Sequence, residues 1–318
     1  MTNKKRCLVL GGNGFIGSHL VDALLRQGHL VRSFDRANVV PAFGKKPQRP
    51  GLQVVEGDFA SEADVAEAIV GCDVCFHLIS TTLPKSSNSD PIFDIETNLM
   101  GTVRLLSHAV RNSIGKIVFV SSGGTVYGPT LSLPIDENHP TNPISSYGIT
   151  KLSIEKYLGL FHRLYGLEYS VLRLSNPYGE RQRPHASQGA VAVFIGKALK
   201  GEAIDVWGDG SVVRDYLHIS DVIEALIKAM DYQGNERILN IGSGCGVSLN
   251  EILDGIGLVL GRQVPRNYST ARAFDVPANV LAIERAKHSL DWRPQVSLLE
   301  GLERTVAWLK SSAAGEAP

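Results

Sequence analysis

Short apolar runs alternate with segments of helical apolar spacing along the first half of the chain. A short apolar run between turn signals is typical of a buried parallel strand, whereas apolar spacing at i, i+3, i+4 and i+7 is typical of a helix. The runs that predict strands occupy residues 6–10, 30–34, 52–58, 73–79, 116–122 and 169–175. The segments with helical spacing occupy residues 14–29, 61–71, 94–113 and a stretch that begins near 145. Because strands separated by helices run parallel, the pattern predicts an α/β fold with a Rossmann-type doubly wound sheet.

The alternation stops near residue 175. Residues 176–189 are rich in Pro, Gly and Arg, and two helical patterns and several short strand-like runs follow them. We therefore expect a Rossmann domain at residues 1–175 and a smaller C-terminal α/β domain at 176–318. A strand-like run near residue 240 indicates that a segment around 215–243 returns to the first domain.

Composition and charge exclude several classes of protein. The chain has 318 residues, 43% of them hydrophobic, and its 32 basic residues balance 32 acidic ones, so no basic field indicates nucleic acid. No apolar run approaches the ~20 residues of a membrane span, and the one after Lys4–Arg6 is too short for a signal peptide. We therefore predict a cytoplasmic protein with no membrane partner. Cys72 and Cys75 lie in an apolar run, which favours buried thiols over a redox or metal pair, and no metal site is predicted.

A glycine-rich loop, "GGNGFIG", joins the first predicted strand to the first predicted helix. In this context Gly11 would allow the tight turn, Gly14 would let the backbone approach a pyrophosphate, and Gly17 would let the helix pack closely on the sheet. The N-terminus of the helix offers free N–H groups and partial positive charge to phosphates. The loop therefore predicts a dinucleotide site.

An acidic residue ends the second predicted strand and bears on the choice of cofactor. Asp35 is placed to accept hydrogen bonds from a ribose, which favours NAD over NADP. Arg36 weakens that preference because an arginine can hold a 2′-phosphate. Asp58 follows the third strand, where a contact to adenine and a simple turn role remain equally open.

Tyr147 and Lys151 stand four residues apart, so on a helix they share one face. Tyrosine has an unperturbed pKa of ~10 and is a poor base at neutral pH. A nearby ammonium and the positive ring of bound NAD both favour the phenolate, so we expect the pKa of Tyr147 to fall toward the range where a general base works. Lys151 is also placed to hold a ribose hydroxyl of the cofactor.

Several motifs resemble one family over nearly the whole chain. They are "GGNGFIGSHL", "TNLMGT", "SSGGTVYG", "YGITK", "RLSNPYG", "GDGSVVRDYLHISD" and "DWRP". The chain resembles the extended short-chain dehydrogenases/reductases of the NAD-dependent epimerase/dehydratase family, and most of all their UDP-glucose 4-epimerase branch. The resemblance implies a homodimer that pairs the long helices around Asn98 and Tyr147.

The resemblance also implies catalytic roles. Tyr147 would remove a proton from a sugar hydroxyl while hydride leaves the same carbon for NAD. The serine or threonine that usually assists it falls at Gly123 here, so Ser122 becomes the first choice and Thr125 the second, as a contact to the sugar. The dehydratases of the family carry two acids where Gly124 and Thr125 stand, so we reject that reaction.

Binding residues follow from the same motifs. Asn98 resembles a buried asparagine that braces the catalytic region, with a direct cofactor role equally open. Asn176 would hydrogen-bond the substrate's diphosphate or sugar, and Arg214 would pair with the diphosphate. Arg272 and Asp275 would bind phosphate and a uridine ribose. Further positions implied to line the cofactor are Phe15, Ile16, Phe59, Leu78 and Ser121.

These expectations converge on a nucleotide-sugar enzyme with NAD. The first hypothesis is a 4-epimerase of a UDP-hexose, of the glucose/galactose type or its N-acetylated or uronic acid form. The alternative is a nucleotide-4-keto-sugar reductase that consumes NADH or NADPH. A non-enzymatic NAD-binding regulator is the third reading, and the presence of Tyr147 and Lys151 weighs against it.

Overall fold

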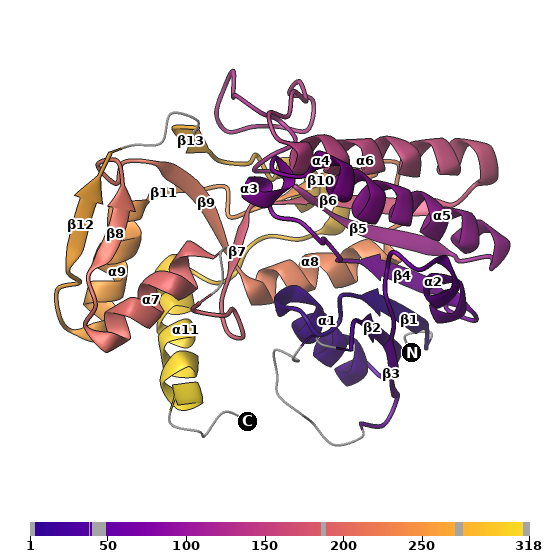
Figure 1. The fold of residues 1–318 in the computed structure, drawn as a ribbon, viewed down its shortest axis with the longest axis horizontal. Coiled ribbons are helices and arrows are strands. Elements are labelled where there is room, and N and C mark those ends of the chain that lie inside the picture. Colours follow the sequence, from indigo (N-terminus) through magenta and orange to yellow (C-terminus); the bar gives the residue numbers. More distant parts are fainter. Residues whose placement is uncertain (1–3, 38, 40–48, 186–188, 271–275, 314–318) are drawn as a thin grey trace. The chain divides into compact units, whose positions relative to one another are not determined.

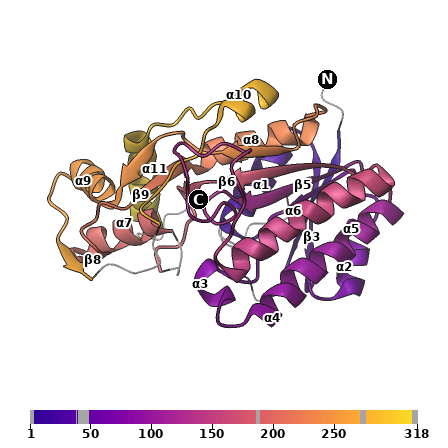
Figure 2. The same cartoon turned by 90° about the horizontal axis from the view of Figure 1, so that it is seen from above.

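The computed structural model describes residues 4–37, 39, 49–185, 189–270 and 276–313. The chain forms two units, and segments far apart in the sequence build each of them (Figures 1 and 2). The first unit comprises Met1–Gly128, Pro140–Arg173 and Ile223–Leu239, and the second comprises Pro129–His139, Leu174–Val222 and Asn240–Pro318. Within the described residues, no helix is both long and apolar enough to cross a lipid bilayer.

A seven-stranded sheet forms the centre of the first unit, with strand order β10-β6-β5-β4-β1-β2-β3. Its strands are β1 (Arg6–Leu10), β2 (Leu30–Asp35), β3 (Leu52–Glu56), β4 (Val74–His77), β5 (Lys116–Ser122), β6 (Glu168–Leu174) and β10 (Ile238–Ile241). The pairs β1–β2, β2–β3, β1–β4 and β4–β5 are all parallel. The predicted Rossmann-type sheet is thus confirmed. The strand order reverses between β1 and β4, which is the switch point where such sheets bind ligands.

Helices cover both faces of this sheet (Figure 2). They are α1 (Phe15–Arg26), α2 (Glu62–Ile69), α3 (Pro84–Ser87), α4 (Pro91–Asp94), α5 (Gly101–Arg111), α6 (Ser146–Tyr165) and α8 (Ile219–Asp231). The core between them is apolar, with Leu8, Phe34 and Phe119 fully buried. Burial of both sheet faces explains why the strands are continuous apolar runs.

The single helix predicted at 94–113 contains an irregular turn. A π-helix, η1 (Ile95–Met100), joins α4 to α5. A π-helical turn inserted in a helix often marks a functional site, and no periodic pattern predicts it. This turn carries Asn98.

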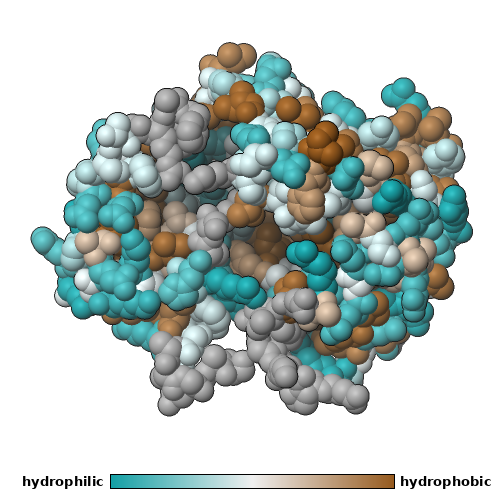
Figure 3. Space-filling view, in the orientation of Figure 1, coloured by the Kyte–Doolittle hydropathy of each residue, from teal (hydrophilic) through white to brown (hydrophobic). Residues whose placement is uncertain are grey.

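Apolar side chains remain exposed over α4, η1 and α6, which are seen at the upper right of Figure 3. We call this set the apolar helix surface: Ile92, Phe93, Ile95, Met100, Ile149, Tyr157, Leu160, Leu164 and Tyr165. Monomeric proteins rarely expose so many large apolar side chains on neighbouring elements.

The second unit is built around β9 (Val213–His218). Parallel β7 (Asn176–Tyr178) and β13 (Ala278–Asn279) and antiparallel β11 (Gly246–Ser248) pair with β9. A two-stranded sheet pairs β8 (Ile204–Trp207) with β12 (Arg266–Ser269). The helices are α7 (Ala190–Lys200), α9 (Leu249–Leu260), α10 (Glu284–Leu290) and α11 (Leu298–Ala313). Their core is separate from that of the first unit, with Ile195, Val206 and Ile252 fully buried.

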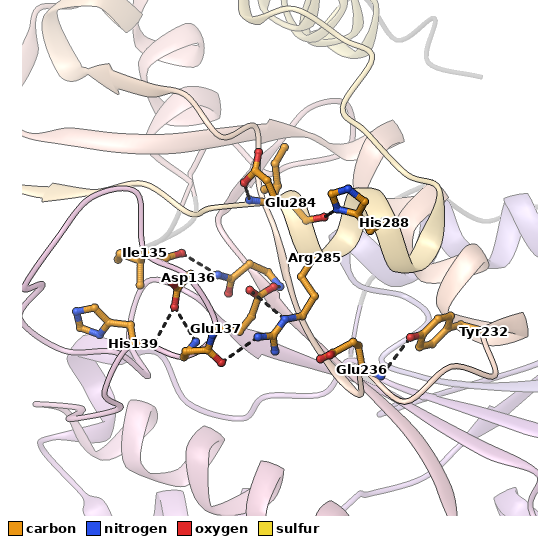
Figure 4. Close-up of polar contacts among 12 residues, drawn as sticks. Ile135, Asp136, Glu137, His139, Tyr232, Glu236, Glu284, Arg285 and His288 are labelled. Carbon is orange, nitrogen blue, oxygen red and sulfur yellow. Dashed lines mark hydrogen bonds and ion pairs between the residues drawn. The ribbon is translucent and has the colours of Figure 1, made fainter.

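A polar cluster fixes residues 129–139 within the second unit (Figure 4). The Oε1 of Glu137 accepts a hydrogen bond from the backbone of Asn240 at 2.8 Å, and Arg285 lies 3.5 Å from the other carboxylate oxygen. Asp136 accepts from the backbone N–H of His139 at 3.0 Å. These contacts hold a segment that follows the loop after β5 directly in the chain.

Candidate functional site

The glycine loop lies at the carboxyl end of β1 and leads into α1. Gly11 has φ +87°, a conformation that favours glycine, and a Cβ on Gly17 would lie 2.0 Å from the Gly11 carbonyl oxygen. A Cβ on Gly12 would lie 2.1 Å from the Ser33 Oγ. The loop therefore packs too tightly for side chains at these positions. A Cβ on Gly14 meets only the Gly11 carbonyl, at 3.2 Å, which leaves this residue open on its other side.

The N-terminus of α1 has the features of a phosphate cradle. Gly14 is its N-cap and supplies no side-chain hydrogen bond, and the first turn carries no acidic residue. By contrast, a serine side chain caps each of α2, α6 and α9. The first N–H groups of α1 are therefore left by the local sequence for an anion, and the residues fit the pyrophosphate of a dinucleotide.

Asp35 ends β2 beside this loop. Its Oδ2 accepts from the backbone N–H of Asn13 at 3.0 Å, and its Oδ1 accepts from that of Arg36 at 3.0 Å. Burial raises the pKa of Asp35 above its usual value, while these two hydrogen bonds lower it. A carboxylate has further lone pairs, so Asp35 can still accept from a ribose. Asp58 accepts from the backbone N–H of Ala60 at 2.9 Å, a local turn contact.

Tyr147 and Lys151 occupy the first turns of α6. Ser145 caps the helix by accepting from the backbone N–H of Gly148 at 3.2 Å, and the Ser87 Oγ accepts from that of Tyr147 at 3.0 Å. The start of the helix is thereby fixed. The Nζ of Lys151 lies 5.6 Å from the ring centroid of Tyr147 and donates to the Val120 carbonyl at 2.9 Å. The predicted pair is thus brought together, and the ammonium lies beside the phenol ring.

Burial controls the electrostatics of the pair. It raises the pKa of Tyr147 to about 12, against a hydrogen bond from Ser80 that lowers it. The expected fall in the pKa of Tyr147 included the positive ring of bound NAD; in the protein alone, desolvation of the phenolate outweighs the influence of its neighbours. Burial also lowers the pKa of Lys151 to about 8, while Asp94 and Glu155 raise it. Lys151 is therefore mostly charged at neutral pH.

Asp94 is a residue that the sequence reasoning missed. It is fully buried and contacts the first turns of α6. Its Oδ2 accepts from Ser146 and Thr150 of α6, each at 2.8 Å. Its Oδ1 accepts from the Nδ2 of Asn98 at 3.0 Å. The carboxylate thus ties α6 to the π-helix.

Asn98 uses both ends of its amide within the protein. Its Oδ1 accepts from the backbone N–H of Thr81 at 2.9 Å, and its Nδ2 donates to the Thr81 Oγ1 at 2.8 Å. These contacts support the bracing role expected for Asn98. They fasten the loop that follows β4.

A buried ion pair lies behind Lys151. The Oε2 of Glu155 accepts from the Nη2 of Arg173 at 2.6 Å, and the Oε1 accepts from the Oγ of Ser121 at 2.5 Å. Ser121 was expected to line the cofactor, and its hydroxyl is committed to this pair. Glu155 is four residues beyond Lys151 on the same helix face, a spacing that could have revealed it.

The other predicted residues of the first unit lie near the ends of β1, β4 and β5. Ser122 is the half-buried last residue of β5. The Oγ1 of Thr125 is buried and has no hydrogen-bond partner among the described residues, which leaves it available to a sugar hydroxyl. The buried Phe59 ring packs 5.0 Å from His77, and the backbone N–H of Leu78 donates to Leu10 at 3.1 Å. Phe15 and Ile16 form the first turn of α1.

The predicted substrate residues belong to the second unit. The Nδ2 of Asn176 donates to the Asp215 carbonyl at 2.9 Å, which places Asn176 beside Arg214 on neighbouring strands. The Nη1 of Arg214 donates to the carbonyls of Val213 and Val276, each at 2.8 Å. Arg272 and Asp275 lie outside the described residues. No group of three or more potential metal ligands occurs in the part of the chain that is described.

Comparisons with known proteins extend over nearly the entire chain. The model of the NAD dependent epimerase/dehydratase family matches residues 7–242. A putative UDP-glucose 4-epimerase of Methanocaldococcus jannaschii is 39% identical over 307 residues, which are 96% of this chain and 98% of that protein. The crystal structure of UDP-glucose 4-epimerase from Thermotoga maritima with UDP-glucose matches with TM-score 0.91 and 36% identity, over 97% of this chain and 99% of that one. The Thermus thermophilus UDP-glucose 4-epimerase complex with NAD matches with TM-score 0.88 and 32% identity, over 96% of this chain and 99% of that one.

Proposed function

Because the chain belongs to the NAD dependent epimerase/dehydratase family, we propose that it is a 4-epimerase of a UDP-hexose. The observation that carries the proposal is the Tyr147–Lys151 pair, in which the Lys151 Nζ lies 5.6 Å from the centroid of the Tyr147 ring. The pair belongs to the same unit as the glycine loop. The sugar is of the glucose/galactose type or its N-acetylated or uronic acid form.

The cofactor of the family is NAD, and the residues present fit it. The first turn of α1 would hold the pyrophosphate, and Asp35 would accept from a ribose. When bound, NAD supplies a hydride acceptor and a positive ring.

Tyr147 would act as the general base on the C4 hydroxyl. Its phenolate oxygen takes the hydroxyl proton as the carbon is oxidised, and it returns that proton when the 4-keto sugar is reduced on its other face. Lys151 stabilises the phenolate through its charge, which Asp94 and Glu155 help to maintain. Since burial raises the pKa of Tyr147 to about 12 in the protein alone, further positive charge from the bound cofactor is needed to reach the phenolate.

Gly124 and Thr125 favour epimerisation over the family's elimination reaction. Neither position carries a carboxylic acid to protonate a leaving C6 hydroxyl, so the intermediate lacks the acid that elimination needs. A nucleotide-4-keto-sugar reductase remains the alternative, and it differs by consuming one reduced cofactor per turnover.

We assign the nucleotide-sugar diphosphate to Asn176 and Arg214. Arg214 offers charge-assisted hydrogen bonds and Asn176 an amide, a combination suited to phosphate oxygens. On this proposal NAD binds to residues 1–175 with the returning segment near 215–243. The nucleotide sugar binds to residues 176–318.

We further propose a homodimer that buries the apolar helix surface. The surface includes Ile149, Leu160 and Leu164 on α6, which are 53%, 44% and 58% exposed. A second copy of the chain, related by a two-fold axis, would cover this surface with its own α4, η1 and α6. Replacement of Leu160 and Leu164 by Glu should halve the mass measured by light scattering. A mass that stays dimeric would place the interface elsewhere.

The central experiment uses the purified protein without added cofactor. UDP-glucose, UDP-N-acetylglucosamine and UDP-glucuronate are each incubated with it, and proton NMR follows inversion at C4. At least one sugar should be inverted with no lasting change in absorbance at 340 nm. The Tyr147→Phe variant should lose about 10²- to 10⁴-fold in rate. Steady consumption of added NADH with a 4-keto sugar would instead establish the reductase.

A further inference from the structure

We propose that Asp94 is a positioning residue for the reaction: its buried carboxylate fixes the rotation of α6 about its axis and so the directions of Tyr147 and Lys151. The inference rests on the proposed function for the reaction that this pair performs. It adds a residue from α4, which lies outside both the glycine loop and the motif of the pair.

Two anchors on α6 stand in register with the catalytic pair. The hydroxyls of Ser146 and Thr150 donate to the same oxygen of Asp94, Oδ2, each at 2.8 Å. Ser146 directly precedes Tyr147 in the chain, in the same way as Thr150 precedes the lysine. Residues four apart share one face of a helix, and neighbouring residues point about 100° apart around it. Two anchors to one oxygen therefore fix the direction of the adjacent face, which carries Tyr147 and Lys151.

The other oxygen of Asp94 holds two elements that flank the site. Its Oδ1 accepts from the Nδ2 of Asn98 at 3.0 Å and from the hydroxyl of Thr82. Asn98 belongs to the π-helix η1, and Thr82 belongs to the loop after β4. This loop lies beside the glycine loop, because a Cβ on Gly11 would lie 3.5 Å from the backbone nitrogen of Ile79. The carboxylate thus fixes α6 relative to both the π-helix and the loop next to the proposed cofactor site.

The network around Asp94 is buried and complete. The side chain of Asp94 is fully buried, and a carboxylate can only accept hydrogen bonds. Each of its partners here is a hydroxyl or an amide NH₂ group, which has a hydrogen to donate. A buried polar network in which each member is satisfied is rigid and specifies one arrangement.

The segment of α3 supports the same end of α6, beside which it lies (Figure 2). The Ser87 Oγ accepts from the backbone N–H of Tyr147 at 3.0 Å, and the Asn88 Oδ1 accepts from that of Ser146 at 2.9 Å. These bonds reach backbone groups near the helix axis and fix where the helix begins. The side-chain bonds to Asp94 act farther from the axis, so they are the ones that fix its rotation.

Steady-state kinetics of UDP-sugar epimerisation separate positioning from binding. Asp94→Ala should lower kcat about 10- to 100-fold, since a misplacement of about 1 Å can cost 10²-fold in rate. KM should stay within about threefold, because the groups assigned to the nucleotide sugar lie in the second unit.

Asp90→Ala is the matched control, since it removes an exposed carboxylate from the other end of α4. Asp90 accepts from the backbone N–H of Phe93 at 2.9 Å and only caps α4. Its replacement should leave kcat within about twofold of the parent. An equal loss of kcat in Asp90→Ala and Asp94→Ala would overturn the proposal, because it would show a general effect of disturbing α4.

Asp94→Asn separates position from charge. The amide has nearly the shape of the carboxylate, its oxygen can accept from Asn98, and its nitrogen can donate to the hydroxyls on α6. Positioning therefore predicts a kcat at least about fivefold above that of Asp94→Ala. An Asp94→Asn variant as slow as Asp94→Ala would show that the charge matters and not the position, and the proposal would be wrong.

Thr150→Val removes one anchor and retains both the carboxylate and the shape of the side chain. It should lower kcat about three- to tenfold in the parent and by no more than about twofold in Asp94→Ala, where the bond is already absent. Losses that multiply in the double variant would show that the two residues act independently, contrary to the proposal.

Hydrogen–deuterium exchange of the purified protein tests the anchoring without turnover. Asp94→Ala should accelerate deuterium uptake at the backbone N–H groups of residues 146–151 at least about tenfold, whereas Asp90→Ala should leave it unchanged. Uptake at the parent's rate in Asp94→Ala would refute the anchoring even if the protein is an active epimerase. If no UDP-sugar is inverted and the uptake still rises, the anchoring of α6 by Asp94 stands and the proposed function is wrong.

Discussion

The buried ion pair between Glu155 and Arg173 offers a quantitative test of the packing behind the catalytic helix. The two side chains are 1% and 3% exposed, and three nitrogen–oxygen contacts of 2.6, 3.1 and 3.3 Å join them. Glu155→Gln removes the negative charge and leaves the guanidinium without a counter-ion. Breaking a buried pair from one side costs about 3–5 kcal/mol.

Thermal unfolding followed by circular dichroism measures this cost. For a unit of this size each kcal/mol lowers Tm by about 2–4 °C, so Glu155→Gln should melt at least about 6 °C below the parent. The double variant Glu155→Met/Arg173→Met should be more stable than either single variant, because it leaves no unpaired charge. If Glu155→Gln melts within about 2 °C of the parent, the pair does not stabilise this unit and the reasoning fails.

The same substitution should also reach the catalytic pair. Glu155 is one of two carboxylates that raise the pKa of Lys151 against the effect of burial. Without it the pKa of Lys151 should fall further below about 8, and Lys151 should lose its charge at lower pH. The alkaline limb of the kcat profile should therefore shift to lower pH in Glu155→Gln. An alkaline limb at the same pH as in the parent would show that Glu155 does not influence the charge of Lys151.

Three further predictions concern the glycine loop, the histidine of β4 and the second unit. Gly17→Ala places a Cβ 2.0 Å from a backbone carbonyl and should weaken NAD binding at least tenfold by calorimetry, whereas Gly159→Ala, whose Cβ meets nothing closer than 3.4 Å, should bind as the parent does. Burial lowers the pKa of His77 to about 3. Below pH ~6.5 this histidine is therefore protonated in the unfolded chain but neutral in the native state, so stability decreases as the pH is lowered. Between pH 6.5 and 5 the parent should lose about 2 kcal/mol more than His77→Phe in urea unfolding, and equal losses would contradict the assignment. The fully buried carboxylate of Asp215 accepts hydrogen bonds from the backbone N–H groups of Ser243 and Leu281. Asp215→Asn disrupts these bonds and should lower the free energy of unfolding of the second unit by about 2–3 kcal/mol. An unchanged midpoint of urea unfolding would refute this.

Elements with a strong local signal were predicted well. The runs at 6–10 and 116–122 are β1 and β5, because a strand buried on both faces must be apolar along its length. The glycine loop was predicted because its conformation requires glycine locally: Gly11 has φ +87°, and a Cβ on Gly17 would lie 2.0 Å from the Gly11 carbonyl oxygen. The π-helical turn at Ile95–Met100 was missed because its apolar spacing does not differ enough from that of an ordinary helix.

The sequence by itself determined the sheet, the glycine loop and the Tyr147–Lys151 pair, since each depends on spacing within a few residues. Only the tertiary structure brought Asp94 to the helix of that pair, because Asp94 lies on a separate segment, α4, and accepts from Ser146 and Thr150 of α6. It also decided the direction of the pKa of Tyr147, which burial raises. Desolvation depends on everything packed around a group, and no motif contains that information.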